Sequence, residues 1–317
     1  MKILAVRNDR LGEFLLTIPA LRALKECYTR AALALVLSPY VQELTEDIGI
    51  ADSIIPWENK KHRPSELIAL VRKLRQEKFD LCIIFNPSRE FNIIGFLAGI
   101  PVRIGYARKW PFLLTHKIED KKYLGLSHEV EYNLELAGLA GINTENKRLS
   151  LKIDNGIIIN LYKENNITER DTLVAIHPWT SDPIKQWPRD YFLELALRLK
   201  ELAGLKVIII GGKEEADKSG NLYSAQSGLI NLAGSTTLKQ LAALLSRCKL
   251  LISGDSGPVH LASGVGGRVL ALFRNDIQGK TAKRWGPWGE GHYVIEKNNL
   301  SDITVDEVFN KAKEMLA

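Results

Sequence analysis

The fold of this chain is most clearly indicated by the stretch Leu250-Leu-Ile-Ser-Gly-Asp-Ser-Gly-Pro-Val-His-Leu-Ala-Ser-Gly-Val-Gly-Gly-Arg-Val-Leu-Ala-Leu-Phe273. It reads as an apolar strand, a polar turn, a short helix and a second apolar strand. Asp255 and Ser256 follow the first strand, and Pro258 suits the first turn of a helix. Such a turn directs backbone N–H groups and a positive helix end toward one point, where an anion such as a phosphate binds. The alternative is an ordinary helix cap, in which Asp255 or Ser256 bonds these N–H groups.

The same alternation of strands and helices extends over the whole chain. Beside the two strands above, apolar runs predict buried parallel strands at 3–6, 33–37, 81–85, 173–176 and 207–210. Helical spacing of apolar residues covers 14–27, 64–77, 129–140, 191–202, 238–248 and 305–316. The sequence therefore predicts an α/β fold of two Rossmann-like, doubly wound domains that face each other across a cleft.

A polar region at 141–171, rich in asparagine, separates the two series of strands. We place the domain boundary in it, which gives domains at 1–155 and 156–317. The last helix, about residues 304–316, is a candidate to pack back on the N-terminal domain. Ligands of such open sheets bind beyond the carboxyl ends of the strands, so we expect the site there.

Composition and charge limit the class of protein. The 317 residues include 43 Lys and Arg against 37 Asp and Glu, a net charge of +6 that is spread along the chain. This charge suits an anionic small substrate or an anionic membrane surface. No basic run with interleaved aromatic residues is present, so we expect no nucleic-acid partner. The sequence does not indicate the oligomeric state.

The three cysteines, Cys27, Cys82 and Cys248, lie far apart without C-x-x-C spacing, which favours a reducing compartment. Charged residues from Arg7 to Glu13 interrupt any signal-peptide core, and no apolar run approaches the roughly 20 residues that span a bilayer. We expect a cytoplasmic protein, with peripheral contact at the cytoplasmic face of the inner membrane as an option.

In each half of the chain, one polar cluster follows the first predicted strand. In the first, residues 7–13, Glu13 opens a helix, where it either complements the helix dipole or acts as a general base. The second, residues 177–188, offers the Thr180 and Ser181 hydroxyls and the Lys185 charge to a phosphate. The alternative interpretation of this second cluster is a solvated loop around Trp187. We expect Trp187 to be structural in either case.

The third and fourth clusters belong to the second half. Glu214 or Glu215, after the strand at 207–210, is placed to accept hydrogen bonds from a ribose, or else only begins a helix. The fourth cluster is the turn at 255–260, in which His260 alone favours a structural role. The histidines and cysteines show no metal-binding spacing, and no Asp-x-Asp pair exists to hold a metal on a diphosphate. We therefore expect neither a metal nor another cofactor.

Together these clusters resemble the inverting glycosyltransferases of family 9, which include the ADP-heptose:lipopolysaccharide heptosyltransferases. The resemblance covers nearly the whole chain, and it rests on the order and spacing of several motifs. These are Ile3-Leu-Ala-Val-Arg-Asn-Asp-Arg-Leu-Gly-Glu13, Thr17-Ile-Pro-Ala-Leu-Arg-Ala-Leu24, Arg103-Ile-Gly-Tyr106, His177-Pro, Lys185-Gln-Trp-Pro188, Asn231-Leu-Ala-Gly-Ser235 and Gly254-Asp-Ser-Gly-Pro-Val-His-Leu-Ala262.

The resemblance implies a GT-B fold, with the acceptor on the N-terminal domain and the nucleotide sugar on the C-terminal domain. It also implies metal-independent, single-displacement transfer with inversion. By position, Glu13 stands where the family usually has an aspartate base, although its side chain is one methylene longer. Lys185 is implied to stabilise the departing diphosphate. The diphosphate and ribose ligands are implied to be Thr180, Ser181, Lys185, Asp255, Ser256, Gly257, His260 and either Glu214 or Glu215, and the acceptor side to involve Asp9, Arg10, Arg89, Arg103 and Arg108.

The leading hypothesis is transfer of a heptose from ADP-heptose to a lipid-linked saccharide, the inner core of lipopolysaccharide. One alternative keeps the fold and mechanism but uses another nucleotide sugar. Another is a nucleotide-sugar-binding protein without catalysis, which only the glutamate at position 13 supports. A Rossmann oxidoreductase is disfavoured because Gly264-Val-Gly266 lacks the third glycine of the dinucleotide fingerprint.

Overall fold

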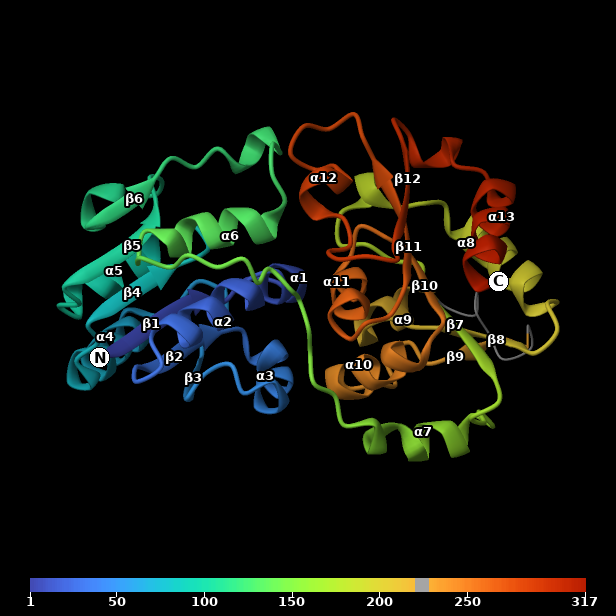
Figure 1. Cartoon of the computed structure of the whole chain (residues 1–317), viewed down its shortest axis with the longest axis horizontal. Coiled ribbons are helices and arrows are strands. Elements are labelled where there is room, and N and C mark those ends of the chain that lie inside the picture. The colour runs from blue at the N-terminus through green and yellow to red at the C-terminus, as the bar shows by residue number, and fades with distance from the viewer. Residues whose placement is uncertain (220–227) are drawn as a thin grey trace. The chain divides into compact units, whose positions relative to one another are not determined.

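The computed structural model describes residues 1–219 and 228–317 and shows two compact α/β units, Met1–Leu149 and Ser150–Ala317 (Figure 1). The division between them lies a few residues before the boundary expected at 155/156. Each unit holds one six-stranded sheet in which every recorded pairing is parallel.

The bounds of the elements are as follows. The first unit contains β1 (Lys2–Arg7), α1 (Leu11–Leu15), α2 (Ile18–Cys27), β2 (Ala32–Leu37), α3 (Gln42–Ile48), β3 (Ser53–Pro56), α4 (Pro64–Glu77), β4 (Leu81–Ile84), α5 (Arg89–Leu97), β5 (Val102–Tyr106), β6 (His116–Ile118) and α6 (Glu129–Gly138). The second contains α7 (Ile159–Glu164), β7 (Thr172–His177), α8 (Arg189–Lys200), β8 (Leu205–Ile209), α9 (Lys213–Ser219), β9 (Ile230–Asn231), α10 (Leu238–Arg247), β10 (Leu250–Gly254), α11 (Gly257–Gly264), β11 (Val269–Arg274), α12 (Ala282–Trp285), β12 (Tyr293–Lys297) and α13 (Val305–Leu316).

The two sheets have the same topology. The strand order is β3-β2-β1-β4-β5-β6 in the first unit and β12-β11-β10-β7-β8-β9 in the second. Read from its own first strand, each is the 3-2-1-4-5-6 order of the Rossmann fold. The prediction of two Rossmann-like domains is confirmed. The order reverses beside β1 and β4 in one unit, and beside β7 and β10 in the other, which are the points where such sheets bind ligands.

The apolar runs became central strands because both faces of these sheets are covered. In β10, all five residues from Leu250 to Gly254 are buried, and β11 is buried up to its last residue. A strand covered on both faces loses the usual alternation of polar and apolar residues. The hydrophobic core of the second unit includes Trp187, whose indole N–H donates to the Ile303 carbonyl at 2.9 Å. The expected structural role of Trp187 is confirmed.

One prediction about helices is wrong. The helix expected at 14–27 is divided into α1 and α2 at Leu16 and Thr17. Pro19 has no N–H to continue the hydrogen bonding of α1, so a new helix starts around it. The last helix, α13, contributes its buried residues to the core of the second unit and packs on α8. Within residues 1–219 and 228–317, no helix is long and apolar enough to cross a membrane.

Candidate active site

The side chain of Arg7 organises the carboxyl end of β1 in the first unit. It is 1% exposed and donates through Nη1 to the Phe85 carbonyl (3.0 Å) and through Nη2 to Oε1 of Glu129 (3.3 Å). Its Nε lies 3.0 Å from Oδ1 of Asp9, and the same Glu129 oxygen pairs with Lys122 Nζ at 3.1 Å. Two cations therefore face two carboxylates in a largely buried network, as buried charges require.

Asp9 is the member of this network with an unusual pKa. Burial raises the pKa of its carboxyl group to about 6, against the opposing effect of the Arg7 guanidinium, and the nearby Glu13 carboxylate adds to the rise. The Asp9 and Glu13 carboxylates therefore repel each other, which favours the protonated form of Asp9. Glu13 itself is half-buried in the first turn of α1, and Arg10 is the residue that precedes this helix.

Three of the four arginines expected on the acceptor side have different environments. Arg103 is tied to backbone carbonyls, because its Nε donates to Leu113 at 2.7 Å and its Nη1 to Ile100. These bonds give Arg103 a structural role, since they hold the strand β5 to the loop that follows it. Arg108 is exposed and pairs with Asp120 at 3.2 Å, while Arg89 lies over the exposed Trp110 ring.

Lys185 and Asp255 meet in the second unit, where the loops after β7 and β10 come together. Lys185 Nζ forms an ion pair with Oδ2 of Asp255, and the two side chains are 20% and 11% exposed. A side chain at Gly254 would touch this loop, because its Cβ would lie 3.2 Å from the Lys185 carbonyl and from Thr180 Cγ2. The absence of a side chain at Gly254 is what lets the two loops approach.

The helix α11 begins at Gly257, two residues after Asp255 in the chain. Ser256 precedes the helix, yet its side chain makes no capping bond to the helix N–H groups, and its Oγ lies 2.8 Å from Ser253 Oγ instead. The alternative of an ordinary cap by Ser256 is therefore wrong. His260 is buried in the same helix. The turn places the start of α11, which the Ser256 side chain does not cap, beside the Lys185 cation, and this arrangement favours an anion.

A chain of polar contacts joins the third and fourth clusters. Glu215 Oε2 accepts from the Gly212 N–H at 2.6 Å and lies 3.4 Å from His177 Nε2. His177 Nδ1 in turn lies 3.3 Å from Ser253 Oγ, which contacts Ser256. Glu215 is thus fixed at the carboxyl ends of β7 and β8, whereas Glu214 is exposed. A side chain at Gly211 would overlap the Trp179 ring, 2.5 Å from the Cβ position.

The structure therefore brings together Thr180, Lys185, Gly254 and Asp255 in one place, and links Glu215 to Ser256 through side chains that sequence analysis missed. His177 and Ser253 are the missed residues of the second unit, and Lys122 and Glu129 those of the first. The positions of His177 and Ser253 in the sequence could have indicated their role, because His177 is the last residue of a strand and Ser253 is a polar residue within an apolar strand. Ser181 lies exposed in the loop after β7. Among the described residues, no three His, Cys, Asp or Glu side chains gather as metal ligands.

Comparison with known proteins identifies the family. The model of glycosyltransferase family 9 (heptosyltransferase) matches residues 67–311, more than half of the chain. The chain belongs to this family, and it is a glycosyltransferase.

Similar proteins match over nearly the whole chain and share its fold. Lipopolysaccharide heptosyltransferase 2 of Escherichia coli is 24% identical, over all of this chain and 99% of its own. The crystal structure of a family 9 glycosyl transferase from Veillonella parvula matches with a TM-score of 0.86 and 22% identity, covering 99% of this chain and 97% of its own. The structure of the E. coli ADP-heptose lps heptosyltransferase II matches with a TM-score of 0.85 and 22% identity, covering 100% and 98%. The expected GT-B type of fold is confirmed.

Proposed function

We propose that this chain transfers a heptose from ADP-heptose to a lipopolysaccharide inner-core acceptor, with inversion and without a metal ion. The names of the similar proteins support the donor and acceptor class. The observation that carries the proposal is the anion site of the second unit. There, Lys185 and the start of α11 lie at the carboxyl ends of β7 and β10, and Glu215 is linked to this turn through His177 and Ser253.

The diphosphate of the donor binds to this anion site. Lys185 exchanges Asp255 for phosphate oxygens, while the Thr180 and Ser181 hydroxyls and the α11 backbone donate hydrogen bonds. His260, buried in α11, supports the same turn. We assign the ribose to Glu215 because its carboxylate is fixed at the strand ends, and Glu214 is the open alternative.

Glu13 serves as the general base of the first unit. It takes the proton of the acceptor hydroxyl as that oxygen attacks the anomeric carbon, and the bond from this carbon to the diphosphate breaks as ADP leaves. Attack opposite the leaving group inverts the configuration. Lys185 and the positive end of α11 stabilise the negative charge that develops on the diphosphate, which is the task a metal ion performs elsewhere.

Acceptor binding is the less defined part of the proposal. Arg10, Arg89 and Arg108 remain exposed or at the surface of the first unit and suit phosphate groups of a lipid-linked saccharide. Near them, Trp110 and Phe112 stack at 5.9 Å and are 47% and 72% exposed. Exposed aromatic and basic groups suit a membrane interface, so we propose peripheral contact at the cytoplasmic face of the inner membrane.

The direct test incubates the protein with ADP-heptose and a Kdo–lipid A acceptor, with or without one heptose, in the presence of EDTA. ADP release and the product mass are followed together. A product heavier by one heptose supports donor, acceptor and metal independence. ADP binding without any product on either acceptor favours a non-catalytic binding protein. Turnover only with another nucleotide sugar assigns a different donor to the same mechanism.

A further inference from the structure

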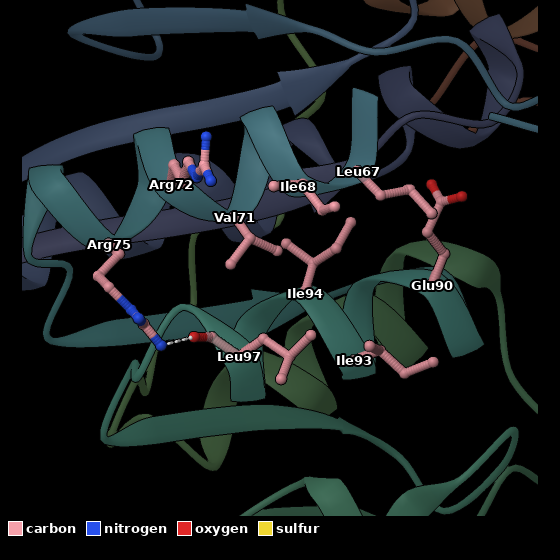
Figure 2. Close-up of a pocket in the computed structure, with 9 residues that line it drawn as sticks. All are labelled: Leu67, Ile68, Val71, Arg72, Arg75, Glu90, Ile93, Ile94 and Leu97. Carbon is pink, nitrogen blue, oxygen red and sulfur yellow. Dashed lines mark hydrogen bonds between the residues drawn. The ribbon is translucent and has the colours of Figure 1, made fainter. Parts of the chain in front are cut away.

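The helices α4 and α5 of the first unit lie side by side and leave an apolar groove between them (Figure 2). We propose that this groove binds the acyl chain of one free fatty acid. It has a volume of about 330 Å³ and no member of the candidate active site lines it. Its walls are made by Leu67, Ile68, Val71, Ile93, Ile94 and Leu97.

The groove follows from the spacing of apolar residues on both helices. Leu67 and Val71 are one turn apart on α4, and Ile93 and Leu97 are one turn apart on α5, so each helix turns a short apolar stripe toward the other (Figure 2). From Leu67 to Arg75 the groove is about 12 Å long at the rise of an α-helix. Ile68 and Leu97 remain 51% and 46% exposed. The groove is therefore open to solvent along these two side chains, so that an apolar ligand can enter it.

The ends of the groove carry opposite charges. Arg72 and Arg75 lie toward the C-terminal ends of the helices, and Glu90 lies at the other end (Figure 2). Arg75 Nη2 donates to the Leu97 carbonyl at 2.6 Å, which holds its guanidinium at the opening. Arg72 makes no ion pair or hydrogen bond within the part of the chain that the structure describes. The two guanidinium groups make this end of the groove positively charged, which attracts an anionic head group.

Glu90 sets the direction of the ligand. Its Oε1 accepts from Trp57 Nε1 at 2.8 Å, and its Oε2 lies 3.4 Å from His62 Nδ1. A carboxylate at this end repels an anion, so the head group binds at Arg72 and Arg75 and the tail extends toward Glu90. The volume is at the lower end for ligand pockets, and it suits one chain rather than the face of a folded partner.

Fluorescence titration of the full-length protein with 11-(dansylamino)undecanoic acid tests the proposal without donor or acceptor. We expect saturable binding of one probe that laurate displaces and acetate does not, because acetate has no tail. The Arg72→Glu variant should weaken binding about tenfold or more, the value of a charge-assisted hydrogen bond. Lys73→Glu, the same charge change at the next exposed position outside the groove, should leave it within about twofold.

A second pair of variants tests the apolar wall. Ile68→Asp should abolish probe binding, whereas Ile159→Asp, at an isoleucine of similar exposure in the second unit, should not. Equal effects of the paired variants, or no saturable binding by the wild type, would overturn the proposal. Sedimentation with phosphatidylglycerol vesicles separates the two sources of such a chain. Equal sedimentation of Arg72→Glu and Lys73→Glu supports a free fatty acid as the ligand, and weaker sedimentation of Arg72→Glu would overturn it in favour of a bilayer lipid.

Discussion

Replacement of Lys185 by alanine removes the cation on which the proposed donor site depends. With side chains 20% and 11% exposed, the Lys185–Asp255 pair lies between a surface pair, worth up to about 1 kcal/mol, and a buried one, whose disruption costs about 3–5 kcal/mol. We therefore expect the free energy of unfolding to fall by about 1–3 kcal/mol, which leaves the protein folded. The loss of a charge-assisted bond to phosphate, about 1.5–3 kcal/mol, should weaken ADP binding roughly 10- to 150-fold.

Calorimetric titration with ADP and the rate of ADP release from ADP-heptose measure the two effects. The matched control is Lys280→Ala, because Lys280 pairs with Asp182 of the same loop at 3.3 Å and both side chains are more exposed. A further variant, Lys185→Ala with Asp255→Asn, should recover part of the ADP affinity, since it removes the carboxylate left facing the diphosphate. If Lys185→Ala bound ADP and turned over like the wild type, the proposed role of Lys185 would be refuted.

Three further perturbations test other parts of the molecule. Glu13→Gln should lower kcat about 10²- to 10⁴-fold with ADP affinity unchanged, and a small effect in the same turnover assay would exclude Glu13 as the base. Because burial raises the pKa of Asp9 from 3.8 to about 6, the native state binds its proton more tightly than the unfolded chain. That stabilisation, at most about 3 kcal/mol, is full below pH 4 and is lost as the pH rises through about 6, so urea unfolding across this window should show it in the wild type and not in Asp9→Asn. Gly211→Ala places a methyl group 2.5 Å from the Trp179 ring and should cost about 1–3 kcal/mol in thermal unfolding, whereas Gly212→Ala, 3.4 Å from Glu215, serves as the control with little effect.

The local order of the chain was predictable from sequence because it depends on short-range rules. The bounds of α4 and α13 agree with the periodicity of their apolar residues, and β10 follows from an apolar run between a charged helix end and a polar turn. Weak, short or half-exposed strands such as β6 and β9 carried no comparable signal. Pro19 divided a helix within an unbroken apolar pattern, because a missing backbone donor outweighs side-chain spacing.

The class of fold, the family and the polar clusters after the central strands follow from the sequence, because strand ends and helix starts can be located from neighbouring residues. The folding of the chain in three dimensions then established which side chains meet. It paired Lys185 with Asp255, joined Glu215 to Ser256 through His177 and Ser253, and tied Arg103 to backbone carbonyls. It also left the groove between α4 and α5 open. These contacts join residues far apart in the chain, and only the parallel sheets bring their strand ends and covering helices into contact.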